Sequence, residues 1–243
     1  MGERKEVSEL AIKNFSSEEP SPFNNLWYDI TQKRIYRRLR KWLKNKIKIK
    51  TLILNAGSGG SDYRITDGVM THLDIVDKLV DSYEKYLVAS IDSIPCEDNS
   101  FDVVICVGSV INYADIILSI KELCRVLKPS GTLILEFERS NSAEFLFSKK
   151  RHKNVVFCDD KYGEQQHKFW VYNEKFVCNV LKNYGLKVRK KYRFHIFSAL
   201  IYRFIKSEKK AARFTFLDHC CFLFSYCLAH NVMFCLTKNA DAI

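Results

Sequence analysis

The chain has 243 residues, with 39 lysines and arginines against 28 aspartates and glutamates, so its formal net charge is +11. Hydrophobic residues make up 47% of it, which suffices for a buried core and excludes a wholly disordered chain. The amino-terminal segment lacks the apolar stretch of a signal peptide, and no run of about 18 apolar residues occurs. We therefore expect a soluble, cytoplasmic protein without a membrane span, built as one domain with an accessory segment.

The nine cysteines show no Cys-x-x-Cys pair, and several lie inside apolar runs. This distribution is typical of buried, reduced thiols rather than of disulfides or a zinc site. The triplet His219, Cys220 and Cys221 is part of an apolar segment that we predict to be a packed helix. We therefore expect no metal site.

Residues 1–49 are expected to form a lid and a basic helix, separate from a domain over residues 50–243. The first 20 residues are polar, and Pro20 and Pro22 break any helix at that point. Helical segments are expected between residues 23 and 48.

Residues 31–50 contain ten lysines and arginines and no acidic residue. Ile35, Leu39, Trp42 and Leu43 recur at helical spacing in this segment and predict one buried face. The opposite, basic face has two interpretations: a solvated surface, or a patch for nucleic acid or an anionic substrate. We favour the solvated surface.

Apolar runs then alternate with one amphipathic helix, an order typical of a parallel, doubly wound α/β sheet. The predicted elements are strands at 50–56 and 68–75, a short third strand before residue 90, a strand at 100–109, a helix at 114–128 and a strand at 132–138. A polar, basic and aromatic insertion at 140–172 is expected to cover the carboxyl edge of the sheet. A helix at 173–185, a strand at 186–195, two apolar helices and a closing strand at 231–238 complete the prediction.

The first predicted strand ends in a cluster of glycines, Gly57, Gly59 and Gly60, in a chain with only 9 glycines. Glycine is placed where the backbone needs positive φ or where another group must come close. A glycine-rich turn after a strand presents backbone N–H groups, usually with a helix N-terminus, to a ligand. The spacing differs from Gly-x-Gly-x-x-Gly because Asp62 occupies the last position, so the turn alone does not distinguish NAD, FAD and S-adenosylmethionine.

Asp74 ends the second predicted strand. A carboxylate at this place can accept hydrogen bonds from both ribose hydroxyls of an adenosyl group. The alternative is a helix N-cap, and we favour the ribose.

Residues 50–140 resemble the class I S-adenosylmethionine-dependent methyltransferases. The matching segments are "IPCEDNSFDVV" and "ELCRVLKPSGTLIL". The resemblance implies an α/β, Rossmann-like fold with a seven-stranded, mostly parallel sheet and an N-terminal helical lid. It also implies S-adenosylmethionine as cofactor, S-adenosylhomocysteine as product and no metal. The cofactor-binding residues that it implies are Asn55, Ala56, Gly57, Gly59, Asp74, Ile75, Ser90, Ile91 and Val107.

The chain departs from the family pattern in its glycine loop. Asn55 stands where the family has the first glycine of Asp-Leu-Gly-Cys-Gly-x-Gly, and we expect it to adopt positive φ in glycine's place. The short interval between Gly59 and Asp74 predicts a shortened first helix. Ser90 replaces a common acidic residue, so Ile91 is expected to contact adenine through its backbone.

Two other methyltransferase chemistries are disfavoured. Pro95-Cys96 precedes the fourth predicted strand, which is the wrong position for the nucleophilic cysteine of cytosine C5 enzymes. No Asn-Pro-Pro-Tyr-like motif follows that strand, which disfavours base N-methylation of that class. Methyl transfer is an in-line displacement, so the protein mainly aligns the acceptor and excludes water.

Candidate acceptor residues come from the lid and from the insertion. Trp27, Tyr28 and Asp29 lie in the lid, and Arg151 and Tyr172 lie in the insertion. A carboxylate among aromatic rings suits a cationic acceptor through ion pairing and cation–π contact. Lid packing for the aromatic residues and helix capping for Asp29 remain as alternatives.

This set is similar to the methyltransferases that dimethylate the N-terminal arginine amine of plantazolicin-type azole peptides. The resemblance implies catalytic roles for Asp29 and Arg151, substrate contacts for Trp27 and Tyr172, and a function in antibiotic, natural-product biosynthesis. Tyr28 and Tyr113 are further candidates for substrate contact.

Two alternative functions remain open. One is O- or N-methylation of a sugar, polyketide or lipid-like small molecule, with Tyr113 or His167 as base. The other, which we rank last, is an RNA methyltransferase or a non-catalytic binder that uses the basic helix. Glu136 and Glu138 end the fifth strand on one face, and either could contact the acceptor. We expect a monomer that acts on a small molecule or modified peptide and does not bind nucleic acid.

Overall fold

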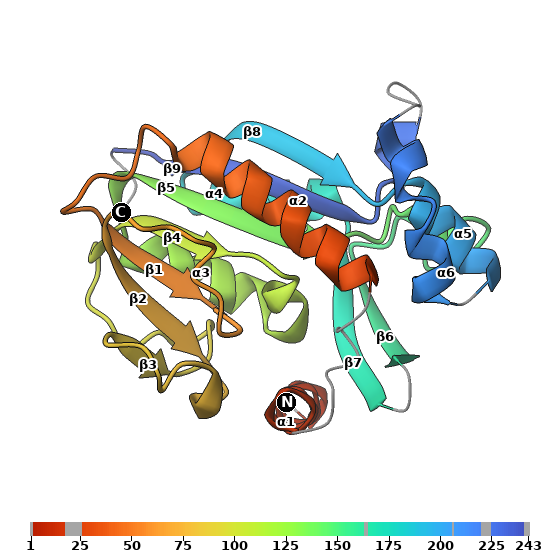
Figure 1. Ribbon diagram of the computed structural model, residues 1–243, viewed down its shortest axis with the longest axis horizontal. Helices are drawn as coiled ribbons and strands as arrows, with labels where there is room; N and C mark the ends of the chain where they lie inside the picture. Colours follow the sequence, from red (N-terminus) through yellow and green to blue (C-terminus); the bar gives the residue numbers. More distant parts are fainter. Residues whose placement is uncertain (1, 18–25, 163–164, 206, 220–224, 241–243) are drawn as a thin grey trace.

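The computed structural model describes residues 2–17, 26–162, 165–205, 207–219 and 225–240. Its centre is a seven-stranded sheet (Figure 1). The strands of this sheet are β1 (Leu52–Ala56), β2 (Val69–Asp74), β3 (Tyr86–Val88), β4 (Phe101–Cys106), β5 (Leu127–Glu138), β8 (Leu186–Phe194) and β9 (Asn231–Lys238). The strand order is β3-β2-β1-β4-β5-β9-β8.

The sheet is parallel except for β9, which runs antiparallel to both of its neighbours. The carboxyl ends of β1, β2 and β4 therefore meet at one edge, where α/β sheets bind their ligands. The predicted α/β fold with a seven-stranded, mostly parallel sheet is confirmed.

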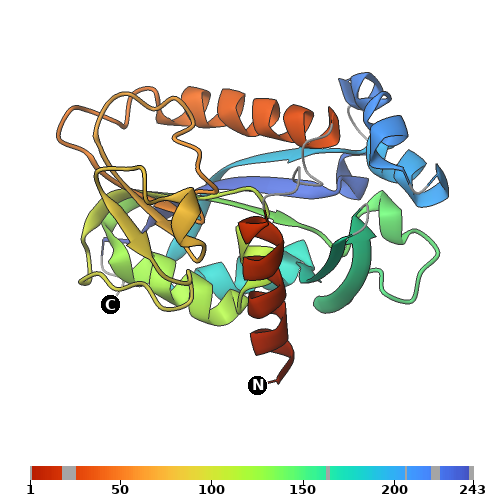
Figure 2. The same ribbon diagram turned by 60° about the horizontal axis from the view of Figure 1, so that its bottom comes forward.

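Helices cover both faces of the sheet (Figure 2). On one face, α2 (Leu26–Leu43) packs Ile35, Leu39 and Trp42 against residues of β1, β4, β5 and β9. On the other face lie α3 (Ile116–Val126) and α4 (Glu174–Asn183), whose apolar stripes join the larger core cluster. A helix that buries one face gains most of its stability from such packing. The apolar face predicted within residues 31–50 is therefore confirmed.

The segment between β1 and β2 is the largest difference from the predicted elements. Residues 57–68, all of which the structure describes, form turns and contain no helix. A shortened helix was expected there. Six residues of this segment have positive φ (Gly57, Gly59, Gly60, Tyr63, Arg64 and Gly68), a conformation that no helix tolerates. The glycine turn thus presents its amides without the dipole of a helix behind it.

The amino-terminal residues form a helix, α1 (Gly2–Ser16), which together with α2 fits the N-terminal helical lid implied by the resemblance, although the polar pattern of the first 20 residues did not indicate it. Only Val7 and Ala11 are buried in it, so its own apolar pattern is weak. Ion pairs join it to the rest of the chain, from Arg4 to Asp115 and from Glu6 to Lys168. In Figure 1 the helix is seen end-on below the sheet, beside β7.

The insertion at 140–172 contains a two-stranded hairpin of β6 (Val155–Tyr162) and β7 (Gln165–Tyr172). A short helical turn, η3 (Ala143–Phe145), precedes it. Phe145, Val156, Cys158, Phe169 and Val171 form a small separate core under the hairpin. The hairpin packs against α1 through β7.

The segment between β8 and β9 forms short helices at the right-hand end of the molecule in Figure 1. They are α5 (Phe197–Ile205), α6 (Glu208–Ala212), η4 (Thr215–His219) and η5 (Ser225–Leu228). The packed helix predicted around His219, Cys220 and Cys221 falls partly on residues 220–224, which lie outside the described residues. Further short elements are η1 (Asp77–Leu79) and η2 (Val110–Tyr113). None of the described helices combines the length and the apolar character that crossing a membrane requires.

Candidate active site

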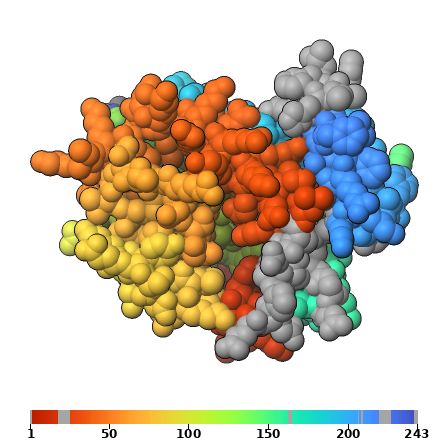
Figure 3. Space-filling view, in the orientation of Figure 1, coloured from red at the N-terminus to blue at the C-terminus, as the bar shows by residue number. Residues whose placement is uncertain are grey.

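A cavity of about 500 Å³ lies over the carboxyl ends of β1, β2, β4 and β5. Its size is within the range of small-molecule sites. α1 and the first turns of α2 supply its outer wall, and the space-filling view shows a recess between these two segments (Figure 3). We call the part beside β1 and β2 the cofactor end and the part beside the carboxyl end of β5 the acceptor end.

The glycine turn forms the floor of the cofactor end. Gly57 has φ +73°, and a Cβ at this position would lie 2.3 Å from a methyl carbon of Val110. Gly59 has φ +53° and faces open space, because a Cβ there would meet no atom within 4 Å. Only glycine satisfies the first position, and at the second the turn leaves room for a ligand to lie against the backbone.

Asp74 lies beside this turn at the end of β2 and is 8% exposed. Its Oδ2 accepts a hydrogen bond from Gly59 N at 2.8 Å, and its Oδ1 accepts one from Val76 N at 3.1 Å. Burial raises the pKa of this carboxyl, and the backbone amides partly offset the effect. Each carboxylate oxygen keeps a second acceptor site, so the residue can also accept hydrogen bonds from a ribose. The open glycine turn and this carboxylate therefore fit an adenosyl group.

The loop after β4 forms the opposite wall of the cofactor end. Gly108 N and Ser109 N both donate to Glu136 Oε2, at 2.9 and 2.7 Å. Asn231 donates to the other oxygen of this carboxylate at 2.7 Å. Burial raises the pKa of Glu136 to about 7 despite these bonds. Glu136 is thus enclosed beneath the loop and holds it in place.

The acceptor end contains a cluster of one imidazole and two carboxylates. His230 lies with Nε2 3.4 Å from Glu138 and Nδ1 3.3 Å from Glu144. Burial opposes protonation of His230, but the two carboxylates outweigh it and raise its pKa to about 10. The cluster thus places a protonated imidazole between two carboxyl groups. All three side chains line the cavity.

Aromatic rings complete the acceptor end. Trp27 stacks on His195 with ring centroids 4.2 Å apart and lies edge-on to His230 at 6.1 Å. His195 is fully buried, and its ring nitrogens contact Thr31 Oγ1 at 2.7 Å and Ser198 Oγ at 3.1 Å. Burial lowers the pKa of His195 well below its usual value, so the imidazole is neutral. Trp27 is therefore supported by a fixed, uncharged ring.

Buried charges support the strand end that carries His230. Arg139 donates to the carbonyl oxygens of Ala229 and Cys227, at 2.9 and 3.1 Å. Its guanidinium also pairs with Glu174 at 3.0 Å. Arg139 N donates to His230 O at 2.9 Å. The backbone on both sides of His230 is thereby fixed.

The structure brings together most of the residues that were predicted to bind the cofactor. Gly57, Gly59, Asp74, Ile75, Ser90, Ile91 and Val107 line the cavity. Asn55 and Ala56 do not, because both are buried in β1. Asn55 pairs with His72 and Ile105 as an extended strand residue and is absent from the positive-φ residues, contrary to expectation. Its amide donates to Ser61 O at 2.7 Å and so braces the glycine turn from behind.

The predicted acceptor residues divide into two groups. Trp27, Tyr28 and Tyr113 line the cavity. Asp29 is exposed in the first turn of α2 and is not part of the lining. Arg151 lies in a turn of the insertion, also outside the lining. Tyr172 is 2% exposed in the core, where its hydroxyl donates to Ala114 O at 3.2 Å.

His167 and Glu136, two further candidates, are buried and do not line the cavity. Sequence reasoning missed His230 and Glu144. No motif marks either residue, because they meet only when the start of β9 and the η3 turn fold against the end of β5. Glu138 was one of two candidates at that strand end, and it is the one that reaches the cavity. Among the residues that the structure describes, no group of three His, Cys, Asp or Glu side chains could hold a metal ion.

Comparison with known proteins agrees with this geometry. Residues 54–135 match the family model of a methyltransferase domain. An uncharacterized protein of Methanocaldococcus jannaschii is 31% identical over 134 residues, which are 51% of this chain and 59% of that protein. A 2-phytyl-1,4-naphtoquinone methyltransferase of Trichormus variabilis is 29% identical over 140 residues, 50% of this chain and 61% of that protein. The matched region thus spans about three fifths of each relative.

A solved structure shares the fold over nearly the whole chain. It is a Burkholderia thailandensis 1,6-didemethyltoxoflavin-N1-methyltransferase with bound 1,6-didemethyltoxoflavin and S-adenosylhomocysteine. The TM-score is 0.62 at 12% identity, with 97% of this chain and 90% of that chain covered. The sequence-based expectation of an S-adenosylmethionine-dependent methyltransferase is thereby confirmed for the domain and the fold. Residues 54–135 are thus similar in sequence to a methyltransferase domain, and the chain as a whole has the class I methyltransferase fold.

Proposed function

We propose that the chain methylates a small molecule at a nitrogen atom, with S-adenosylmethionine bound at the cofactor end and the acceptor beside Glu138. The observation that carries the proposal is the position of the Glu138 carboxylate. It faces the same cavity as Asp74 and Gly59, and it is held there by His230.

The residues of the cofactor end would hold the adenosyl group. Asp74 accepts hydrogen bonds from the ribose, Gly57 and Gly59 allow close approach of the ligand, and the walls at Ile91 and Val107 enclose the base. When bound, S-adenosylmethionine supplies a methyl group activated by its sulfonium.

The residues of the acceptor end would align the nucleophile and receive its proton. An amine must be neutral to attack, and the neighbouring Glu138 carboxylate accepts the proton that it loses. Trp27, Tyr28 and Tyr113 orient the acceptor, while α1 and α2 exclude water from the cavity. The carboxylates of the cluster and the aromatic rings favour a nitrogen compound that is cationic in water.

A more specific candidate for the acceptor is an azole peptide with an N-terminal arginine. The aromatic rings and carboxylates of the acceptor end support a guanidinium or amine acceptor in general. Asp29 and Arg151, for which the resemblance implies catalytic roles, both lie outside the cavity lining. In this proposal Glu138, rather than Asp29, is the carboxylate that faces the acceptor, and the peptide is one acceptor among several to be tested. A role in antibiotic biosynthesis would follow only if the azole peptide is the acceptor.

The test is mass spectrometry of candidate acceptors incubated with the protein and S-adenosylmethionine. The panel contains nitrogen heterocycles, primary and secondary amines, amino sugars, azole peptides with a free N-terminal arginine, phenols and short RNAs. Methylation of nitrogen compounds, reduced by Glu138→Gln, is the expected result. Methylation of phenols or RNA alone would contradict the proposed acceptor, and failure to bind S-adenosylhomocysteine in calorimetry would contradict the cofactor.

A further inference from the structure

One end of the molecule exposes several large apolar side chains. This end comprises α5, the chain from α6 to η4, and the loop 146–153, which follows η3 beside α5. The exposed apolar residues are Phe147, Phe204, Ile205, Phe214 and Phe216, with exposed fractions of 97%, 75%, 45%, 38% and 64%. We call this set, with the basic residues around it, the α5 surface. Apolar side chains gathered in this way are typical of an interaction site.

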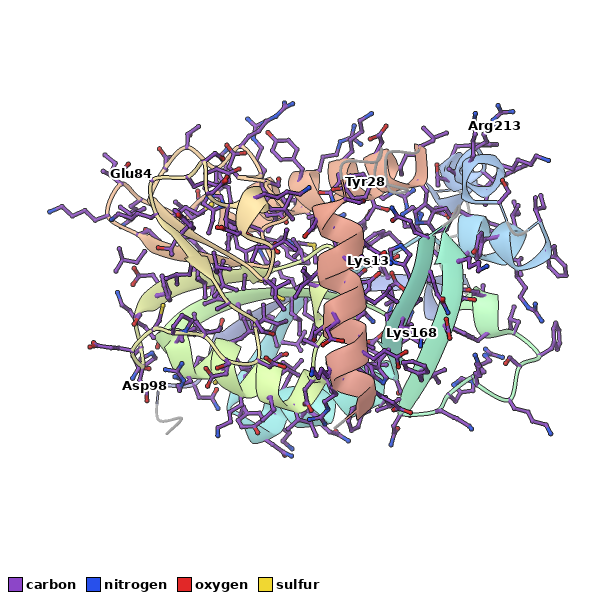
Figure 4. All side chains as sticks on the ribbon, turned by 90° about the horizontal axis from the view of Figure 1, so that it is seen from below. Lys13, Tyr28, Glu84, Asp98, Lys168 and Arg213 are labelled. Carbon is purple, nitrogen blue, oxygen red and sulfur yellow. The ribbon has the colours of Figure 1, made fainter. Side chains whose placement is uncertain are left out.

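Basic side chains surround these apolar residues. The exposed cations of the same segments are Lys149, Lys150, Lys153, Arg203, Lys209, Lys210 and Arg213. In the sequence, Glu208 and Asp218 are the only acidic residues within 146–153 and 197–219, and Asp218 is buried in an ion pair with Arg34. Figure 4 shows Arg213 on the helices at this end, well away from Lys13 on α1. The α5 surface is therefore both apolar and strongly positive.

Helix α5 connects this surface to the acceptor end of the cavity. Ala199 and Tyr202 line the cavity from α5. Phe204 follows Tyr202 by two residues, so it projects from nearly the opposite side of the helix. The helix therefore separates the cavity from the α5 surface by its own width.

We propose that the α5 surface docks on an anionic membrane. Phenylalanine and isoleucine enter the boundary between headgroups and acyl chains, while lysine and arginine pair with lipid phosphates. The α5 surface combines exposed apolar side chains with basic ones, as binding at the boundary between headgroups and acyl chains requires. A second copy of this chain would bring the same cations face to face, which like-charge repulsion opposes. RNA would use the cations but gain nothing from burying Ile205.

The test is co-sedimentation of the full chain with lipid vesicles. One vesicle preparation contains phosphatidylcholine alone, and the other contains equal parts of phosphatidylcholine and phosphatidylglycerol. The protein is expected to sediment with the anionic vesicles and to remain in solution with the neutral ones. Lys209→Glu with Arg213→Glu should weaken binding at least about twentyfold, because each basic residue near an anionic surface contributes roughly fivefold. Phe204→Ser with Phe216→Ser should also weaken it.

Matched control residues follow the carboxyl end of α2 and are not part of the α5 surface. Lys44→Glu with Lys48→Glu changes the net charge equally, and Ile49→Ser removes an apolar side chain that is 82% exposed. Both controls should retain vesicle binding. Thermal unfolding and S-adenosylhomocysteine binding of every variant verify that each is folded. The assay needs no acceptor, so its outcome is independent of the proposed methyl transfer.

Three results would overturn the proposal. The first is absence of binding to anionic vesicles by the wild type. The second is equal loss of binding in the α5-surface and control variants, which would indicate a general effect of charge. The third is a dimer in light scattering that Phe204→Ser converts to monomer, or tighter binding to short RNA than to vesicles, since either would assign the surface to another partner.

Discussion

His230 Nε2 lies 3.4 Å from Glu138 Oε2, and the two side chains are only 12% and 18% exposed. Burial works against the charged imidazole, but Glu138 and Glu144 raise its pKa to about 10. The folded protein thus holds a proton that the unfolded chain releases near pH 6.5. This pair makes the acceptor end a source of pH-dependent stability.

The first prediction follows from this pair. The stabilisation due to protonated His230 is complete below about pH 6.5 and is lost as the pH rises toward about 10, because the unfolded state binds fewer protons in this window. Urea unfolding across the window should show stability falling more steeply for the wild type than for His230→Gln. The exposed His152 provides the matched control, since His152→Gln should keep the wild-type slope. Equal slopes for the wild type and His230→Gln would refute a protonated His230.

The second prediction concerns the glycine turn. Gly57→Ala places a Cβ 2.3 Å from Val110 Cγ1 in a backbone with φ +73°. We expect a loss of about 1–3 kcal/mol in the free energy of unfolding and loss of S-adenosylhomocysteine binding. Adding Val110→Ala removes both methyl carbons but leaves Val110 Cβ at 2.9 Å and the backbone strain, so stability should return only in part. Gly59→Ala, where a Cβ meets no atom within 4 Å, should destabilise less. Calorimetry and urea unfolding measure both quantities, and equal effects at the two glycines would contradict the steric argument.

Much of the fold could be predicted from the sequence because its strands are buried and its main helices amphipathic. Apolar runs at β1, β4 and β5 identify strands covered on both faces. α3 and α4 follow a helical apolar period and have capping residues, Asp115 and Asn173. These local signals agree with the tertiary packing, so the elements were correctly located.

The elements that were missed lack such a signal or have a weak one. α1 buries only Val7 and Ala11 and depends on ion pairs with Asp115 and Lys168, which no local pattern reveals. After β1, Tyr63 and Arg64 take positive φ, which is incompatible with a helix. No local sequence pattern indicates this backbone conformation. β7 did contain a signal, since its burial alternates through His167, Phe169 and Val171.

The two ends of the cavity also differ in how far the sequence predicts them. The cofactor end consists of short segments that each follow a strand, so position in the sequence indicates position in space. The acceptor end joins Glu138, Glu144 and His230 from three separate segments. Their meeting depends on the antiparallel insertion of β9 beside β5, which spacing in the sequence does not encode.

The third prediction separates the two carboxylates of the acceptor end. Glu138→Gln removes the proposed proton acceptor without changing the shape of the side chain, and kcat should fall about 10²- to 10⁴-fold. Glu144→Gln removes the other partner of His230 and should cause a much smaller loss. Both variants should bind S-adenosylhomocysteine as the wild type does. The measurement is steady-state kinetics on the acceptor found in the panel, and equal losses would argue against Glu138 as the proton acceptor.

The fourth prediction concerns Glu174, which joins three cations behind the acceptor end. Its carboxylate contacts Arg139 at 3.0 Å, Arg193 at 2.6 Å and Lys191 at 2.5 Å. Burial alone would oppose its ionisation, but these cations lower the pKa of Glu174 below its usual value. Its contribution is therefore present above about pH 4.5 and is lost as the pH falls.

Glu174→Gln should reduce the free energy of unfolding at neutral pH by about 3–5 kcal/mol, because buried Arg139 loses its counter-charge. The difference from the wild type should shrink in acid, where the wild-type carboxylate is also neutral. The matched control is Asp98→Asn, which breaks a 2.8 Å ion pair with Arg125 at a carboxylate that is 68% exposed. That change should cost at most about 1 kcal/mol, since water already screens the pair. Comparable losses in the two variants would show that burial of Glu174 does not strengthen its pairing with Arg139.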